Sequence, residues 1–136
     1  MRHGIVWVLV GLTVSSVVHL TAHHPMGRVY DQQRTMTIEG DVGRVLHVVP
    51  HPRLHLVVED DQGTMRTWAV ELDAANQLTG SAVSQAVLGL GDRIMVCGNP
   101  GRDPGEYRLH MLTLTRLSDG WSVASEHRPA SQCESS

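Results

Sequence analysis

The chain has 136 residues, of which 41% are hydrophobic, and this is enough apolar material for one compact domain. Its formal net charge is −3, its 11 lysine-plus-arginine positions are all arginines, and phenylalanine is absent. Such a composition provides no overall positive field to hold phosphates and few rings to stack on bases. We therefore expect no nucleic acid among the partners.

The N-terminus has the pattern of an export signal. Arg2 precedes a mostly apolar run at 5–18, and Leu-Thr-Ala at 20–22 is a plausible cleavage site. The run is shorter than the roughly 20 apolar residues of a spanning helix. We predict a signal peptide at 1–22 and a periplasmic or secreted protein that begins at His23. If the segment stays uncleaved, it is the only contact with a membrane that we expect.

The following residues predict an arm, a strand-rich domain and a tail. Residues 23–35 lack periodicity and are expected to be extended, whereas residues 124–136 are polar and are expected to be disordered. Between them, glycines at 40 and 43 indicate a bend in a long first strand. The predicted strands are 36–49, 54–59, 65–72, 93–98 and 106–117, with short helical segments at 74–78 and 81–88.

Three strands, a short helix and two further strands are the order of an OB-like five-stranded barrel, which we predict for residues 36–123. A small open β-sandwich is the alternative that fits the same pattern. In OB barrels the face of strands 2 and 3, with the loops after strands 1 and 4, is the usual binding surface. Those loops are 49–53 and 99–105. Cys97 and Cys133 either form one disulfide or remain a buried thiol and a loose one.

Several short motifs resemble those of a family of small exported bacterial proteins that is known only as a domain of unknown function. The resemblance implies an exported OB-like domain and supplies no activity. The matching residues are His23 and His24, the Thr-Ile-Glu-Gly-Asp-Val run at 37–42, Pro50 and His51, Trp68 and Glu71, Gly91 and Asp92, and Asp119 and Gly120.

Histidines supply the sharpest functional hypothesis. Cleavage after Ala22 would give His23 a terminal amine beside its imidazole, and such nitrogen-rich sites suit Cu(II) or another transition metal such as Ni(II) or Zn(II). His24, His51 and His55 could complete the site. In a reversal centred on His51, His47 and His55 would lie opposite each other. The alternative is that these histidines serve only packing and turn formation.

Other residues favour structural roles. Lone carboxylates such as Glu39, Glu71 and Asp92 usually accept hydrogen bonds or pair with arginines, and Trp68 is expected in the core. Because no catalytic constellation is visible, we predict a non-enzymatic exported binding module whose ligand is a small molecule, a metal ion or an envelope protein. A structural or protein-interaction domain of the cell envelope that binds no metal is the alternative. The candidate ligand surface comprises Pro50, His51, Pro52, Trp68 and Glu71.

Overall fold

The computed structural model describes residues 26–46, 48, 51–73, 88–125 and 128–133. The predicted signal peptide, His23, His24, His47 and Pro50 lie outside this part of the chain, as do both predicted helical segments except Leu88. Within the described residues, none of the helices has the length and apolar character needed to cross a membrane.

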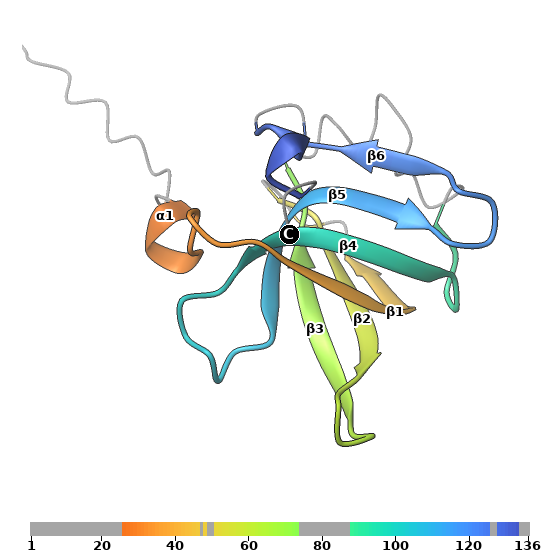
Figure 1. Ribbon diagram of the computed structural model, residues 1–136. Helices are drawn as coiled ribbons and strands as arrows, with labels where there is room; N and C mark the ends of the chain where they lie inside the picture. The colour runs from red at the N-terminus through yellow and green to blue at the C-terminus, as the bar shows by residue number, and fades with distance from the viewer. Residues whose placement is uncertain (1–25, 47, 49–50, 74–87, 126–127, 134–136) are drawn as a thin grey trace, which may run out of the picture.

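Six strands and two short helices make up the described structure (Figure 1). The helix α1 (Met26–Val29) precedes β1 (Met36–Leu46), β2 (Arg53–Glu59) and β3 (Met65–Glu71). After residues 74–87 follow β4 (Arg93–Pro100), β5 (Arg108–Arg116), β6 (Ser122–Ala124) and the 3-10 helix η1 (Ala130–Cys133). The five predicted strands are all present, with ends that differ by a few residues. β6 is an additional strand.

The sheet closes into a barrel. Its strand order is β3-β2-β1-β4-β5-β6, and a parallel pairing of β3 with β5 joins the two sides. This pairing covers the last three residues of the β3 edge, 69–71, which would otherwise expose unpaired backbone groups. β6 pairs with residues 113–115 in the second half of β5 as an additional edge strand. The predicted OB-like five-stranded barrel is therefore confirmed, and the open sandwich is wrong.

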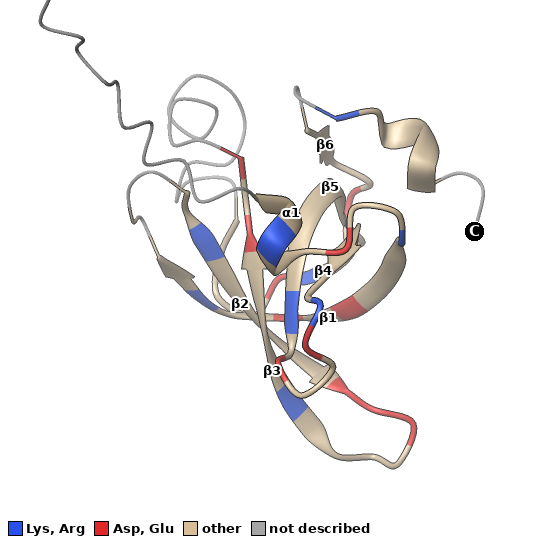
Figure 2. Cartoon of the chain, turned by 90° about the vertical axis from the view of Figure 1, so that its left-hand side faces the viewer, with Lys and Arg blue, Asp and Glu red and all other residues tan. Residues whose placement is uncertain are grey.

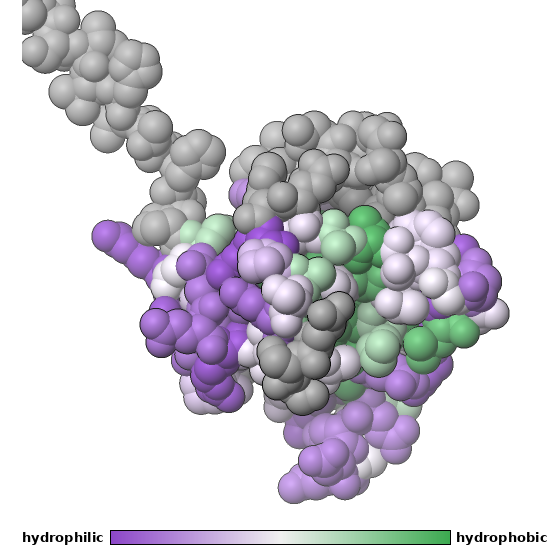
Figure 3. All heavy atoms as spheres, turned by 45° about the horizontal axis from the view of Figure 1, so that its top comes forward, coloured by the Kyte–Doolittle hydropathy of each residue, from purple (hydrophilic) through white to green (hydrophobic). Residues whose placement is uncertain are grey.

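An aliphatic core fills the barrel because buried and exposed residues alternate along β2 and β3. Leu54, Leu56 and Val70 are fully buried, and burial of such a side chain stabilises the fold by about 1.5–3 kcal/mol. Trp68 packs partly buried against this core, as expected for a core residue. Figure 3 shows apolar residues gathered in one patch right of centre, while hydrophilic residues cover the left side and the lower end of that face.

The long first strand bends at its glycines. A register shift between Val42 and Arg44 places a bulge at Gly43, as the sequence predicted. At Gly40 the chain passes so close to β2 that an added Cβ would lie 2.5 Å from the carbonyl oxygen of Val57. The strand therefore requires glycine at this position for the close approach of two backbones.

The segments on either side of the barrel differ from the prediction. Residues 26–29 form a helical turn rather than an extended arm, closed by a hydrogen bond from the Tyr30 N–H to the Met26 carbonyl. The tail carries η1, and a disulfide joins Cys133 to Cys97 in β4. Polar composition indicated disorder there, but side-chain contacts and a covalent bond attach the described part of the tail to the barrel.

Candidate functional site

The outer face of β1, β2, β3 and β5 contains part of the predicted ligand surface. Successive side chains of a strand point to opposite sides. Because Leu54 and Leu56 point inward, Arg53 and His55 point outward from β2, and Ala69 and Glu71 do so from β3.

Strand register aligns the outward side chains in two rows across four strands. In one row Arg44 pairs with His55, His55 with Ala69, and Ala69 with Arg108. The neighbouring row contains Leu46, Arg53, Glu71 and His110. Neighbouring strands are about 4.8 Å apart, so each row extends about 14 Å. We call Arg44, Arg53, His55 and Arg108 the basic face.

Two arginines of the basic face make no ion pair within the described part of the chain, namely Arg44 and Arg53. Both are exposed. By contrast, Arg108 lies 3.2 Å from Glu106 and over the Tyr30 ring, 6.0 Å from its centroid. Figure 2 shows basic positions from several strands, and one on α1, on the side of the barrel that faces the viewer. Four other arginines are paired with carboxylates: Arg66, Arg93, Arg102 and Arg116.

Tyr30 forms one border of the basic face. The residue is only 2% exposed, because it follows α1 directly and bridges to Gly101 beside β5. Its hydroxyl donates a hydrogen bond of 2.7 Å to Glu71 Oε2, and its ring centroid lies 5.4 Å from that of His110. Burial raises the pKa of the Tyr30 hydroxyl, and the bond to Glu71 raises it further. Tyr30 is therefore a protonated donor at neutral pH.

A buried polar cluster lies behind Tyr30. Ser125 donates a hydrogen bond to Asp73 Oδ2, while His110 Nε2 lies 3.3 Å from Asp73 Oδ1. This latter contact lacks the alignment of a hydrogen bond. Both side chains therefore contact the same carboxylate, with no hydrogen bond from Ser125 to His110. In a nucleophilic triad the imidazole lies between the serine and the carboxylate, so this arrangement suits a structural cluster that attaches the tail.

Of the four histidines predicted to bind metal, only His51 and His55 lie in the described part of the chain, so the structure does not test this prediction. His55 lies opposite Arg44, so the predicted pairing of His47 with His55 is wrong. Leu46 pairs with Arg53, so this register differs from that of a reversal centred on His51. Among the described residues no group of three histidine, cysteine or acidic side chains could hold a metal ion. His51 is half-buried, and its Nδ1 has no hydrogen-bond partner there.

The predicted ligand surface is only partly on the outer face. Glu71 lies there, whereas Pro52 is buried. Trp68 pairs with the inward-facing Leu56 and meets the ring of Tyr107 edge-on at 5.5 Å. Trp68 is therefore packed between the core and Tyr107 and does not offer a free ring to a ligand.

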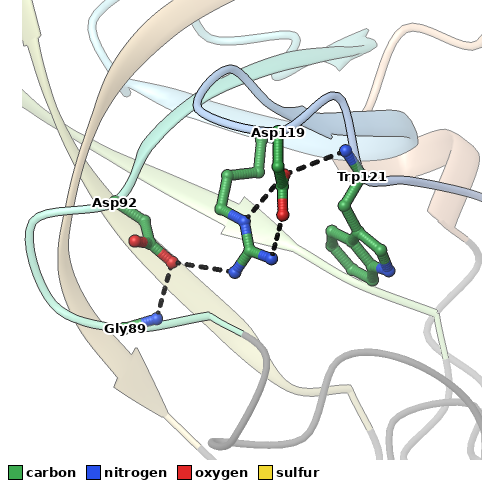
Figure 4. Close-up of polar contacts among 5 residues, drawn as sticks. Gly89, Asp92, Asp119 and Trp121 are labelled. Carbon is green, nitrogen blue, oxygen red and sulfur yellow. Dashed lines mark hydrogen bonds and ion pairs between the residues drawn. The ribbon is translucent and has the colours of Figure 1, made fainter.

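Carboxylates of the recurring motifs stabilise the fold (Figure 4). Arg116 binds Asp119 through two contacts of 3.1 and 2.7 Å, approaches Asp92 at 3.4 Å and lies 5.7 Å from the Trp121 ring centroid. Asp92 also accepts a hydrogen bond of 2.8 Å from the Gly89 N–H. The predicted pairing of these carboxylates with arginines is thus observed at Asp92.

Glu39, in the motif at 37–42, is paired in the same way, since Arg93 Nε lies 2.9 Å from its Oε1. Glu71 differs from both, because its observed partner is Tyr30.

Sequence reasoning missed the basic face. Arg44, His55 and Arg108 are far apart in sequence, and their alignment depends on the bulge at Gly43 and on the parallel pairing of β3 with β5. The absence of acidic residues at 53–58 was the one local signal that could have indicated a basic outer side of β2.

These features define a small OB-fold protein, a class in which the barrel's outer face and its flanking loops bind ligands. The chain belongs to DUF6152, a family of unknown function whose model matches residues 11–109. No curated protein sequence matches the chain.

Several solved structures share the fold. The mitochondrial single-stranded DNA binding protein Rim1 of S. cerevisiae is 15% identical with a TM-score of 0.47, covering 62% of this chain and 92% of that chain. The Stn1–Ten1 complex of S. pombe is 18% identical with a TM-score of 0.47, and the match covers 63% of this chain and 60% of that chain. The small single-stranded DNA-binding protein of Streptomyces coelicolor is 16% identical with a TM-score of 0.40, and the match covers 65% of this chain and 96% of that chain. At these identities the likeness concerns the fold alone.

One sequence-based expectation is corrected by these matches. We excluded nucleic acid as a partner from the overall charge and the scarcity of aromatic residues. Similar barrels in Rim1 and in the S. coelicolor protein are described as single-stranded DNA binding. The exclusion of nucleic acid is therefore withdrawn, and these matches assign no partner to this chain.

Proposed function

We propose that this protein is an exported, non-enzymatic binding module that holds an anionic ligand on its basic face. The observation that carries the proposal is the alignment of Arg44, His55 and Arg108 around Ala69, with Arg53 in the next row. The ligand chemistry is a phosphate or a carboxylate, because guanidinium groups bind both through paired, charge-assisted hydrogen bonds.

The local electrostatics support an anion. An arginine without an acidic partner presents its full charge to a ligand, and this applies to Arg44 and Arg53 within the described structure. Ala69 separates His55 from Arg108 with a small side chain, so a ligand can approach the sheet between them. Since the whole chain carries −3, any attraction of anions must come from this local group of charges and must fall as salt increases.

Export is supported by two independent features. The N-terminal pattern at 1–22 resembles a cleaved signal, and disulfides such as Cys97–Cys133 persist mainly in oxidising compartments. Expression in a bacterial host, cell fractionation and mass spectrometry of the N-terminus test this part. We expect periplasmic or secreted protein that begins at His23, whereas cytoplasmic protein with an intact segment would contradict it.

Binding is tested with two labelled polyanions, a short oligothymidylate and an oligogalacturonate, by fluorescence anisotropy at low and moderate salt. The double variant R44Q/R53Q should weaken binding at least tenfold and reduce the salt dependence, since two charged contacts are lost. R93Q, which removes an exposed arginine of β4 that is already paired with Glu39 and Asp41, is the control and should bind normally. If the double variant bound both probes as tightly as the wild type, the site would be wrong. The two probes distinguish phosphate from carboxylate.

A transition metal is the second candidate ligand, and the orphaned Nδ1 of His51 favours it. His23 and His24 would supply the other ligands, with Cu(II) as the first ion to test. His55 is a poor contributor, because the Arg44 charge beside it opposes a cation. Calorimetry of untagged mature protein with Cu(II) should then give binding that H51A weakens. Equal binding by H51A would remove this candidate, and an envelope-protein partner would remain as the alternative.

A further inference from the structure

Glu71 is the acidic residue placed to neutralise Arg53 of the basic face. It lies directly opposite Arg53 in the pairing of β2 with β3, in the middle of the second row. Side chains at directly opposed positions of neighbouring strands are close enough to form an ion pair. Arg53 nevertheless has no ion pair in the described structure, and Glu71 instead accepts the hydrogen bond of Tyr30.

Tyr30 holds Glu71 from the opposite side of the row. The residue is brought there by the helical turn α1 and by its bridge to Gly101. Its hydroxyl lies 2.7 Å from Glu71 Oε2, and its ring packs beside His110. A buried phenol with one partner and a tightly packed ring has few other positions, so the direction of the Glu71 carboxylate is determined by Tyr30.

We infer that Tyr30 is a positioning residue of the anion site: by binding Glu71 it keeps this carboxylate from neutralising Arg53, and the N-terminal segment thereby becomes part of the site. The inference rests on the proposed function, because it concerns the same face. It assigns the segment before β1 a direct effect on ligand affinity, with no contact between Tyr30 and the ligand required.

The consequence of losing the hydroxyl follows from the geometry. In Y30F the ring packing can remain, but Glu71 loses its donor and the nearest cation across the strand pair is Arg53. An anionic ligand must then displace this internal carboxylate. Because exposed ion pairs are weak, the expected loss of affinity is about two- to fivefold. Removing the charge of Glu71 should reverse it.

The experiment compares wild type, Y30F, E71Q and Y30F/E71Q in binding to whichever labelled polyanion binds the wild type. We expect Y30F to bind more weakly, the double variant to recover wild-type affinity, and E71Q alone to bind at least as tightly as wild type. Nitrogen-15 NMR of the Arg53 side chain should show an ion pair in Y30F only. Thermal unfolding reports any change in stability separately from affinity.

Each other result overturns the inference. Unchanged affinity in Y30F would show that Glu71 does not reach Arg53. Equal loss in Y30F and Y30F/E71Q would show that the hydroxyl acts through stability alone. Weaker binding by E71Q would show that Glu71 contributes to ligand binding rather than opposing it. This variant also keeps the test valid if Y30F does not fold. Failure of the proposed function itself would be recognised separately, by unchanged binding in R44Q/R53Q.

Discussion

At the residue scale, Arg116 shows how one side chain connects three parts of the chain. It emerges from the end of β5, binds Asp119 in the turn before β6 and reaches Asp92 in the turn before β4. Asp119 also accepts a hydrogen bond of 3.0 Å from the Trp121 N–H. The presence of aspartate at motif positions 92 and 119 therefore follows from the geometry of two turns.

The pH dependence of stability should reveal the Asp119 contact. The hydrogen bond from Arg116 lowers the pKa of Asp119 to about 2, below its usual value of about 3.9 in an unfolded chain. A carboxyl with a depressed pKa stabilises the fold above its unfolded value, and this contribution is lost as pH falls toward 2. The difference in urea midpoint between wild type and D119N should therefore shrink between about pH 4 and pH 2.

The control is D61N, which alters an exposed aspartate in the turn between β2 and β3. Asp61 has no ion pair with an arginine in the described structure, unlike Asp119. The urea midpoint of D61N should therefore stay close to that of wild type over the same pH range. If the difference in urea midpoint between wild type and D119N stayed constant from neutral to acidic pH, the charge of the Asp119 carboxylate would contribute nothing to stability.

The sequence indicated what kind of group would contact each carboxylate better than it indicated which residue. Carboxylates at strand ends were expected to pair with arginines, and Glu39 and Asp92 do so. The partner of Glu71 was not expected to be Tyr30, because the contact joins residues 41 positions apart. Such a contact depends on where the N-terminal segment crosses the sheet, and nothing in the local sequence determines this path.

At the element scale, β1 is the strand on which the barrel depends. It pairs with β2 along its second half and with β4 along its first half, so it must bend between the two. Gly43 supplies the bulge and Gly40 the close approach to β2. Both glycines were identified from the sequence, because a glycine inside a strand usually marks a bulge or a close approach of two backbones.

G40A should destabilise the fold by about 1–3 kcal/mol, the usual cost of forcing extra volume into a packed region. The added Cβ would lie 2.5 Å from the Val57 carbonyl oxygen and 2.8 Å from Val58 Cγ2, and the first of these atoms cannot rotate away. Urea denaturation measures the change. G27A is the control, because its Cβ would meet only Gln32 at 3.7 Å, and it should change stability little. Equal stability of both variants would contradict the observed strand spacing.

At the scale of the whole molecule, the order of elements predicted the barrel, because few arrangements of five strands satisfy every sheet edge. The basic face was not predictable to the same degree. Its rows depend on register, and one shifted residue would move Arg44 away from His55. The described parts of the N-terminal and C-terminal segments were also missed, because they are held by contacts to distant strands rather than by any periodic pattern of their own.

The disulfide is the strongest of these attachments, since it joins β4 to η1 across 36 residues. Cross-linking restricts the unfolded chain, and for a loop of this kind the stabilisation is typically about 2–4 kcal/mol. C97A/C133S should lose this amount in urea denaturation, and wild type treated with dithiothreitol should lose a similar amount. Both cysteines line a groove of about 570 Å³.

The control is C97A/C133S measured with and without dithiothreitol. Its stability should be the same in both conditions, because the variant has no cysteine. The expected result also bears on localisation: a domain that loses much of its stability on reduction is suited to an oxidising compartment. Anion binding by reduced wild-type protein at low urea should persist, since the residues of the basic face come from β1, β2 and β5 and none of them belongs to the disulfide. Loss of binding on reduction, with the barrel still folded, would show that the tail contributes to the site.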